Sequence, residues 1–381
     1  MATVRRLLKP EEFRDAIALS DEMFRDAEQV SMGVGFPGVF SQTLKQSYGA
    51  FSDTDGKLVS FMGLVPSIVR IGSAKLNVYS LGSVCTDRGH RGQGYASEIL
   101  QAIIPHMEQA GSPLLFVSGG RGLYTRLGCA QYGGYTQYTL DAASASAIHL
   151  NGELSYREMT ETDWFHLQEI AEARPVRFEQ SVWDLAQLID AEALPRCIKH
   201  GQRVLVAERN GKPEAYLIIG IPNTPTIKQP PRAYEWGGPA QTVAALHAHV
   251  VTHYGLEQLN TFVPWHEEEL HASLKDVQNR QPYRSYCTVM IVSPERLALQ
   301  LKPYLADKNA TLAETFELRK TGDEGSVQLS LAGKSAVVSP HELISLLFDV
   351  HPESDIDPAL KAELSQLLPI PMPGELGLNY V

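Results

Sequence analysis

The chain has 381 residues, enough for two or three domains that bury ample core without disulfides. Its 33 basic and 44 acidic side chains give a formal net charge of −11, which disfavours general nucleic-acid binding and favours cationic partners. Four cysteines without paired spacing, no signal-peptide pattern and no apolar run of about 20 residues predict a reduced, cytoplasmic protein that does not bind membranes.

The first 140 residues predict helices, then a hairpin, then a third strand. An amphipathic helix is expected over 11–19, and Asp55-Gly56 is a favoured two-residue turn before the strand-like run 58–65. The run 81–86 reads as the next strand, and 132–140 is expected to supply the strands that close this sheet. This order predicts an α/β domain with one mixed sheet.

A glycine-rich turn, Arg88 to Ala96, directly follows the strand expected at 81–86. Gly92 and Gly94 let main-chain N–H groups approach a ligand closely, and the start of a helix favours an anion such as a pyrophosphate. The spacing is neither the dinucleotide fingerprint nor a P-loop. A helix is predicted after this turn, because the apolar residues there fall on one face at helical spacing: Ala96, Ile99, Leu100, Ile103 and Met107.

A second motif lies about 20 residues further along the chain. A short apolar strand, Leu114 to Val117, is followed by Ser118 and a glycine-rich turn that carries Tyr124. A phenol with an ordinary pKa of about 10 is protonated at neutral pH, so Tyr124 is a candidate general acid.

The plan recurs in the second part of the chain. A boundary is expected in the small-residue run 141–147, a helix is expected from about 158, and Asn210-Gly211 predicts a second hairpin. The helix expected over 240–253 has the same position in this second part as the helix after the glycine-rich turn has in the first. Trp236-Gly237-Gly238-Pro239 lacks the pattern of that turn, so we expect no pyrophosphate there.

From about residue 285 a third unit is expected. Its predicted elements are a strand at 288–292, a helix at 294–305, strands at 313–318 and 326–331, and a helix at 340–348. These suit a small α+β layer.

Residues 84–128 resemble a known family of enzymes. Arg91-x-x-Gly94-x-Ala96 resembles the coenzyme A loop of GNAT acetyltransferases. The segment from Gly119 to Gly128 is similar to the tyrosine-bearing segment of the Eis group, which belongs to the GNAT acetyltransferases. The resemblance implies an α/β fold with mixed sheets: tandem GNAT folds followed by a domain similar to sterol carrier protein. The implied domains are a catalytic one at 1–145, a degenerate GNAT-like one at 146–284, and the third at 285–381, whose tail reaches the active site.

The resemblance also implies the chemistry. We expect an N-acetyltransferase that transfers acetyl from acetyl-coenzyme A to a primary amine of a cationic small molecule, aminoglycoside-like or a polyamine, by direct attack in a ternary complex. Tyr124 is then the acid, and the terminal carboxylate of Val381 the base. The implied coenzyme A contacts are Val84, Cys85, Thr86, Arg91, Gly92, Gln93, Gly94, Tyr95, Ala96, Ser97 and Ser118.

Candidates for the acceptor pocket are Phe24 as an apolar wall, with Asp26 and Glu375 as acidic groups. No metal is expected, because His266 and His271 are five residues apart and do not fit H-E-x-x-H. The family likeness implies a homo-hexamer.

Two other readings stay open. The chain could be a non-catalytic carrier that binds coenzyme A or a hydrophobic ligand. Alternatively, it could acetylate a lysine or the N-terminus of a protein. Replacement of Tyr124 separates the first of these from the enzyme, and a screen of peptides against small amines separates the second.

Overall fold

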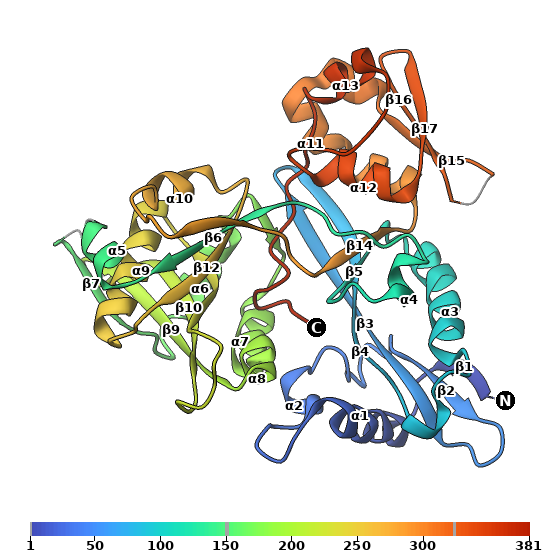
Figure 1. The fold of residues 1–381 in the computed structure, drawn as a ribbon, viewed down its shortest axis with the longest axis horizontal. Coiled ribbons are helices and arrows are strands. Elements are labelled where there is room, and N and C mark those ends of the chain that lie inside the picture. The colour runs from blue at the N-terminus through green and yellow to red at the C-terminus, as the bar shows by residue number, and fades with distance from the viewer. Residues whose placement is uncertain (1, 149–151, 323–324) are drawn as a thin grey trace. The chain divides into compact units, whose positions relative to one another are not determined.

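The computed structural model describes residues 2–148, 152–322 and 325–381, and its chain divides into two compact units (Figure 1). Unit 1 comprises Met1–Tyr132, Ser285–Met372 and Val381, and unit 2 comprises Gly133–Arg284 and Pro373–Tyr380. Each unit is a mixed α/β structure, as the sequence predicts.

The main sheet of unit 1 has the strand order β1-β2-β3-β4-β5-β14. Its pairs are antiparallel except for β4 with β5, which are parallel. The strands are β1 (Ala2–Arg6), β2 (Tyr48–Ser52), β3 (Leu58–Ile71), β4 (Ala74–Thr86), β5 (Leu114–Val117) and β14 (Thr288–Ile291). The helices around this sheet are α1 (Pro10–Phe24), α2 (Met32–Gly35), the 3₁₀ turn η1 (Arg88–His90), α3 (Tyr95–Ala110) and α4 (Gly122–Thr125).

Helices cover both faces of this sheet because its long strands are apolar on both sides. Met62 of β3 joins the core formed with α3, in which Ile99 and Ile103 are fully buried. Its neighbour Phe61 points to the opposite face and stacks on Phe40, with ring centroids 5.3 Å apart. The predicted helix after the glycine-rich turn is confirmed as α3, and the predicted hairpin as β2 and β3.

The strand that closes the sheet of unit 1 comes from a different part of the chain than expected. The expected closing segment, 132–140, forms β6 (Tyr135–Leu140), which pairs with β12 and β13 in unit 2. Thr288 to Ile291, expected in the third unit, instead pairs as β14 with β5. Both predictions are wrong because β6 and β14 take corresponding places, antiparallel to β12 and to β5, and local pattern does not specify which sheet a strand joins.

The sheet of unit 2 has the order β13-β6-β12-β11-β10-β9-β7. The remaining strands of unit 2 are β7 (Leu154–Glu158), β8 (Val176–Phe178), β9 (His200–Arg209), β10 (Lys212–Pro222), β11 (Arg232–Gly237), β12 (Leu259–Pro264) and β13 (Arg280–Tyr283). Its helices are α5 (Ala142–Ala147), α6 (Trp164–Glu172), α7 (Val182–Ala191), α8 (Ala193–Cys197), α9 (Ala240–His253) and α10 (Glu268–Ser273). The second hairpin and α9 are confirmed, and the helix expected from about 158 begins at Trp164.

Residues 294–364 add a three-stranded antiparallel sheet and three helices to unit 1. The strand expected from 313 starts at Glu317, because α11 continues to Thr315. The elements are α11 (Pro294–Thr315), β15 (Glu317–Lys320), β16 (Val327–Leu331), β17 (Lys334–Val338), α12 (Pro340–Phe348) and α13 (Pro358–Leu364). Within the described ranges no helix has the length and apolar character that crossing a bilayer requires.

Candidate functional site

The two parallel strands of unit 1 stay paired over only a short stretch. β4 pairs with β5 from Val78 to Leu81, opposite Leu114 to Val117. β5 ends at Val117, whereas β4 continues to Thr86. The last part of β4 therefore presents an edge that β5 does not cover, and three predicted ligand contacts, Val84, Cys85 and Thr86, lie along it.

A β-bulge interrupts β4 at the point where the strands part. Phe61 faces Cys85 and Gly63 faces Gly82, so Ser83 and Val84 together oppose Met62. Ser83 has a positive φ of 51°. A bulge removes main-chain groups from the ladder, so N–H groups here can serve a ligand. Glycine inside a strand often marks a bulge, so Gly82 was the signal in the sequence that could have predicted this one.

The hydroxyl of Ser83 is a further group that the sequence analysis missed. Its Oγ is buried and has no hydrogen-bond partner in the described part of the chain. A buried hydroxyl without a partner is costly, so a polar group of a ligand placed beside the bulge would satisfy it.

The end of the chain lies against the same part of β4. A Cβ built on Gly82 would meet the terminal carbonyl carbon of Val381 at 2.5 Å. Ser118, the residue after β5, donates a hydrogen bond of 2.5 Å from its hydroxyl to the terminal carboxylate of Val381. The structure thus brings the predicted base Val381 together with Ser118 and β4. Glycine at position 82 is what makes this close approach possible.

Tyr124, the predicted acid, is on α4 and only 5% exposed. Burial raises the pKa of its phenol to about 12, so the phenol is protonated at neutral pH. Its ring lies 3.9 Å from a Cβ built on Gly119, the residue after Ser118. The turn after β5 therefore carries a hydroxyl that contacts the chain terminus and a phenol that retains its proton.

The glycine-rich turn leaves its main chain open to solvent. Gly92 and Gly94 have φ values of 77° and 87°, which favour glycine, and a Cβ on Gly92 would meet nothing within 4 Å. The amides of Ser97 and Glu98 donate to the carbonyl of Gly94 at 2.9 and 3.1 Å. The N–H groups at the very start of α3 have no helical partner, as at any helix N-terminus, and this end of α3 is suited to an anion. Of the predicted donors, Ser97 already uses its amide within the helix.

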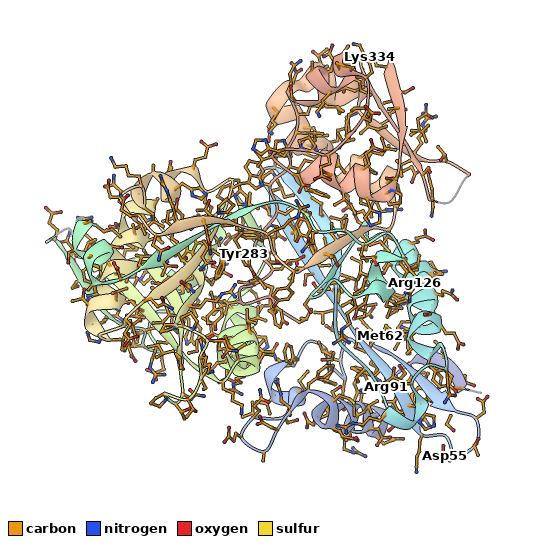
Figure 2. All side chains as sticks on the ribbon, in the orientation of Figure 1. Asp55, Met62, Arg91, Arg126, Tyr283 and Lys334 are labelled. Atoms are coloured by element: carbon orange, nitrogen blue, oxygen red, sulfur yellow. The ribbon has the colours of Figure 1, made fainter. Side chains whose placement is uncertain are left out.

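Side chains next to this turn are arranged to leave it open. The guanidinium of Arg91 is exposed (Figure 2), and its Nε donates to the carbonyl of Thr86 at 3.4 Å. The thiol of Cys85 points to α1, where its sulfur lies 3.6 Å from the hydroxyl of Ser20. Burial raises the pKa of Cys85 to about 11, so this thiol is a poor nucleophile. Gln93 accepts a hydrogen bond of 2.9 Å from the hydroxyl of Tyr95, and Ala96 is half-buried on α3.

The three predicted acceptor contacts are divided between the units. Phe24 ends α1 and is 37% exposed, and exposed Asp26 follows it and accepts a hydrogen bond from the amide of Glu28 at 3.0 Å. Both lie in unit 1, whereas Glu375 is buried in unit 2. His271 is hydrogen-bonded to Tyr138, and nowhere in residues 2–148, 152–322 and 325–381 do three His, Cys, Asp or Glu side chains converge as metal ligands.

Comparison with known proteins agrees with this geometry. Residues 4–132 match the family model of the acetyltransferase (GNAT) domain. A probable N-acyltransferase from Enterococcus faecalis is 14% identical, with a TM-score of 0.65 over 89% of this chain and 85% of its own. A GCN5-related N-acetyltransferase from Anabaena variabilis is also 14% identical, with a TM-score of 0.62 over 91% and 89%.

Eis1 from Mycobacterium abscessus is 13% identical, with a TM-score of 0.59 over 88% of this chain and 85% of that one. At such identities the likeness concerns the fold. The sequence matches none of the curated proteins with which it was compared. The family match covers the diverging strands, the glycine-rich turn and Tyr124, and residues 4–132 of the chain therefore form an acetyltransferase (GNAT) domain.

Proposed function

We propose that the chain transfers acetyl from acetyl-coenzyme A to a primary amine of a cationic small molecule, aminoglycoside-like or a polyamine. The observation that carries this proposal is the hydrogen bond from Ser118 to the terminal carboxylate of Val381, beside the uncovered edge of β4. A carboxylate at that place suits an amine that must lose a proton near the acyl donor.

The glycine-rich turn would hold the pyrophosphate of coenzyme A. Its amides from Arg91 to Ala96 and the start of α3 supply donors, and exposed Arg91 adds a cation. The uncovered edge of β4 at Val84 to Thr86 would pair with the amide groups of the pantetheine arm. The thioester would then lie at the bulge, where a freed main-chain N–H could donate to the oxyanion that forms during transfer.

Proton transfer would then involve two groups, the terminal carboxylate of Val381 and the phenol of Tyr124. The amine nitrogen attacks the thioester carbonyl carbon and loses a proton to the carboxylate of Val381, directly or through a water molecule. The carbon–sulfur bond breaks, and Tyr124 gives its proton to the departing thiolate. An α-carboxylate has an ordinary pKa of about 3.5, so Val381 is a weak base that acts through its position.

Two features support a cationic acceptor. The chain has a net charge of −11, and Asp26 lies exposed beyond the end of α1. We also propose three domains, at 1–145, 146–284 and 285–381, of which the last is similar to sterol carrier protein. In addition, we propose a hexameric assembly and a cytoplasmic location. Each of these proposals rests on the resemblance to Eis-type acetyltransferases or on composition.

The test is a panel of amines, including aminoglycosides and polyamines, incubated with acetyl-coenzyme A and analysed by mass spectrometry. We expect an acetylated amine with the wild type, and turnover reduced by about 100-fold or more for Tyr124→Phe. Binding of acetyl-coenzyme A should be retained in the variant. Unchanged turnover in Tyr124→Phe rejects the acid role. If the wild type acetylates peptides but no small amine, the acceptor is a protein instead. If it acetylates nothing, the carrier function is favoured.

A further inference from the structure

Unit 2 repeats the strand order of unit 1, and it contains a pocket at the position that corresponds to the acetyl-transfer site. The pocket has a volume of about 400 Å³. It lies between the end of β11, the start of α9 and the segment after β12. These three elements correspond to β4, α3 and the turn after β5 in unit 1.

The main chain of this pocket cannot hold a pyrophosphate as the first site does. A Cβ on Gly238, which precedes α9, would lie 2.5 Å from the carbonyl oxygen of Glu214 and 2.6 Å from Ala215. Gly238 is thus packed against β10, whereas Gly92 in the first site faces open space. The lining also carries three consecutive carboxylates, Glu267 to Glu269, which repel an anion.

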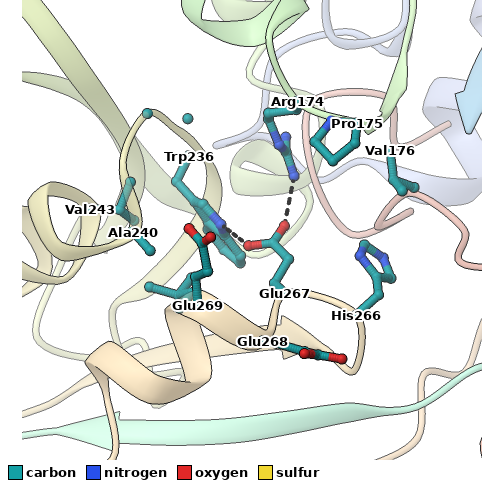
Figure 3. A pocket seen from close by; sticks show the side chains of 13 residues that line it. Arg174, Pro175, Val176, Trp236, Ala240, Val243, His266, Glu267, Glu268 and Glu269 are labelled. Atoms are coloured by element: carbon teal, nitrogen blue, oxygen red, sulfur yellow. Dashed lines mark hydrogen bonds and ion pairs between the residues drawn. The ribbon is translucent and has the colours of Figure 1, made fainter. Parts of the chain in front are cut away.

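Two charged residues that line the pocket, Arg174 and Glu267, already bind each other. Arg174 donates to Glu267 at 3.1 Å (Figure 3). It also forms an ion pair with Glu235. The indole N–H of Trp236 donates to the second oxygen of Glu267 at 2.7 Å. This network fixes the Trp236 ring and neutralises Glu267, so Arg174 is not available to attract an anionic ligand.

Within the described residues, Glu268 and Glu269, unlike Glu267, are not paired with a cation. Both are exposed and both line the pocket (Figure 3). In the part of the chain that the structure describes, neither carboxylate has an ion-pair partner. The other walls are apolar and include Val176, Val243 and Leu270, beside the Trp236 ring. Figure 3 shows the carboxylate of Glu269 beside the Trp236 ring, whereas that of Glu268 points away from the ring. A free carboxylate next to an aromatic ring and an aliphatic wall, with a second one on the same segment, is complementary to an ammonium group on a hydrocarbon chain.

We infer that this pocket of unit 2 binds an organic amine cation with an apolar segment, and that it does so without acetylating it. The pocket lacks the open glycine turn that a coenzyme A pyrophosphate needs. The inference does not depend on the proposed function, because it concerns binding in unit 2 alone.

The test is calorimetric titration of the full chain with diaminooctane, which has two ammonium groups on a hydrocarbon chain, and with octanediol, its uncharged counterpart. We expect the diamine to bind at one site per chain that the diol does not occupy. The double variant Glu268→Gln/Glu269→Gln should weaken that site by about tenfold or more. Ala240→Phe, which fills the pocket and leaves every charge in place, should abolish it.

Glu257→Gln is the matched control, because Glu257 is exposed in the same unit and does not line the pocket. It should leave diamine binding unchanged. An unchanged number of diamine sites in both pocket variants, or a diol that binds as well as the diamine, would overturn the inference. So would a second equivalent of coenzyme A that Ala240→Phe removes. None of these results requires acetyl transfer, so the pocket and the proposed activity can fail separately.

Discussion

The hydroxyl of Ser118 and the terminal carboxylate of Val381 are 263 positions apart in the chain and are joined by a hydrogen bond of 2.5 Å. Hydrogen bonds to a charged acceptor are roughly twice as strong as neutral ones. Gly82 completes the arrangement, since a side chain at that position would occupy the space of the carboxylate. Two residues of the GNAT domain thus determine where the end of the chain lies.

Ser118→Ala should lower kcat by about tenfold to 100-fold, because one hydrogen bond to a charged group contributes about 1.5–3 kcal/mol. If Ser118 acts by positioning Val381, the KM for acetyl-coenzyme A should change little. Ser118→Thr, which keeps the hydroxyl, should restore most of the rate. Steady-state kinetics with the best amine checks this. A rise in KM for acetyl-coenzyme A at constant kcat would instead assign Ser118 to cofactor binding alone.

Gly82→Ala should displace the carboxylate of Val381, because the new Cβ would lie 2.5 Å from its carbon. The chain end can move, so we expect loss of activity with little loss of stability. The double variant with Ser118→Ala should be no slower than the worse single variant, since both act through Val381. Gly134→Ala is the control, because a Cβ there meets nothing within 4 Å. Additive losses in the double variant would show that the two residues act independently.

Tyr124 should make stability depend on pH at the alkaline end. Its pKa is raised by burial to about 12 in the folded chain, against about 10 when unfolded. A raised pKa contributes stability that is intact below about pH 10 and is lost as the pH rises towards 12. By about pH 11 the wild type should have lost about 1 kcal/mol more than Tyr124→Phe. Urea unfolding of both proteins at several pH values measures this, and parallel curves would mean that Tyr124 is not desolvated.

Local sequence pattern was sufficient for the elements that hold the site. α3 follows from apolar residues spaced at helical intervals, such as Ile99 and Ile103, and the second hairpin follows from its two-residue turn. The first hairpin forms as predicted, but the loop 53–57 joins its strands in place of the two-residue turn expected at Asp55-Gly56. The partner of Val381 could not be predicted, because no local feature links Ser118 to a residue 263 positions away.

The exchange of β6 and β14 was missed for the same reason. Neither strand carries a local signal for one sheet or the other, and only non-local pairing with β12 or with β5 decides between them. The bulge at Ser83 is a different case, because Gly82 within a strand was a usable signal.

Gly92→Ala should raise the KM for acetyl-coenzyme A, and the chain offers a close control for the cost of changing the backbone. Gly92 and Gly211 both have a φ of 77°, and a Cβ on either would meet nothing within 4 Å. Alanine at either position is strained to the same extent, by about 1–2 kcal/mol, so both variants should lose similar stability in urea.

Only Gly92→Ala places a methyl group at the turn that is proposed to hold the pyrophosphate. We therefore expect its KM for acetyl-coenzyme A to rise by about tenfold or more, while Gly211→Ala, in the hairpin of β9 and β10, keeps the wild-type value. Equal KM values in the two variants would show that the main chain at position 92 does not contact the cofactor, because backbone strain alone would then explain both values.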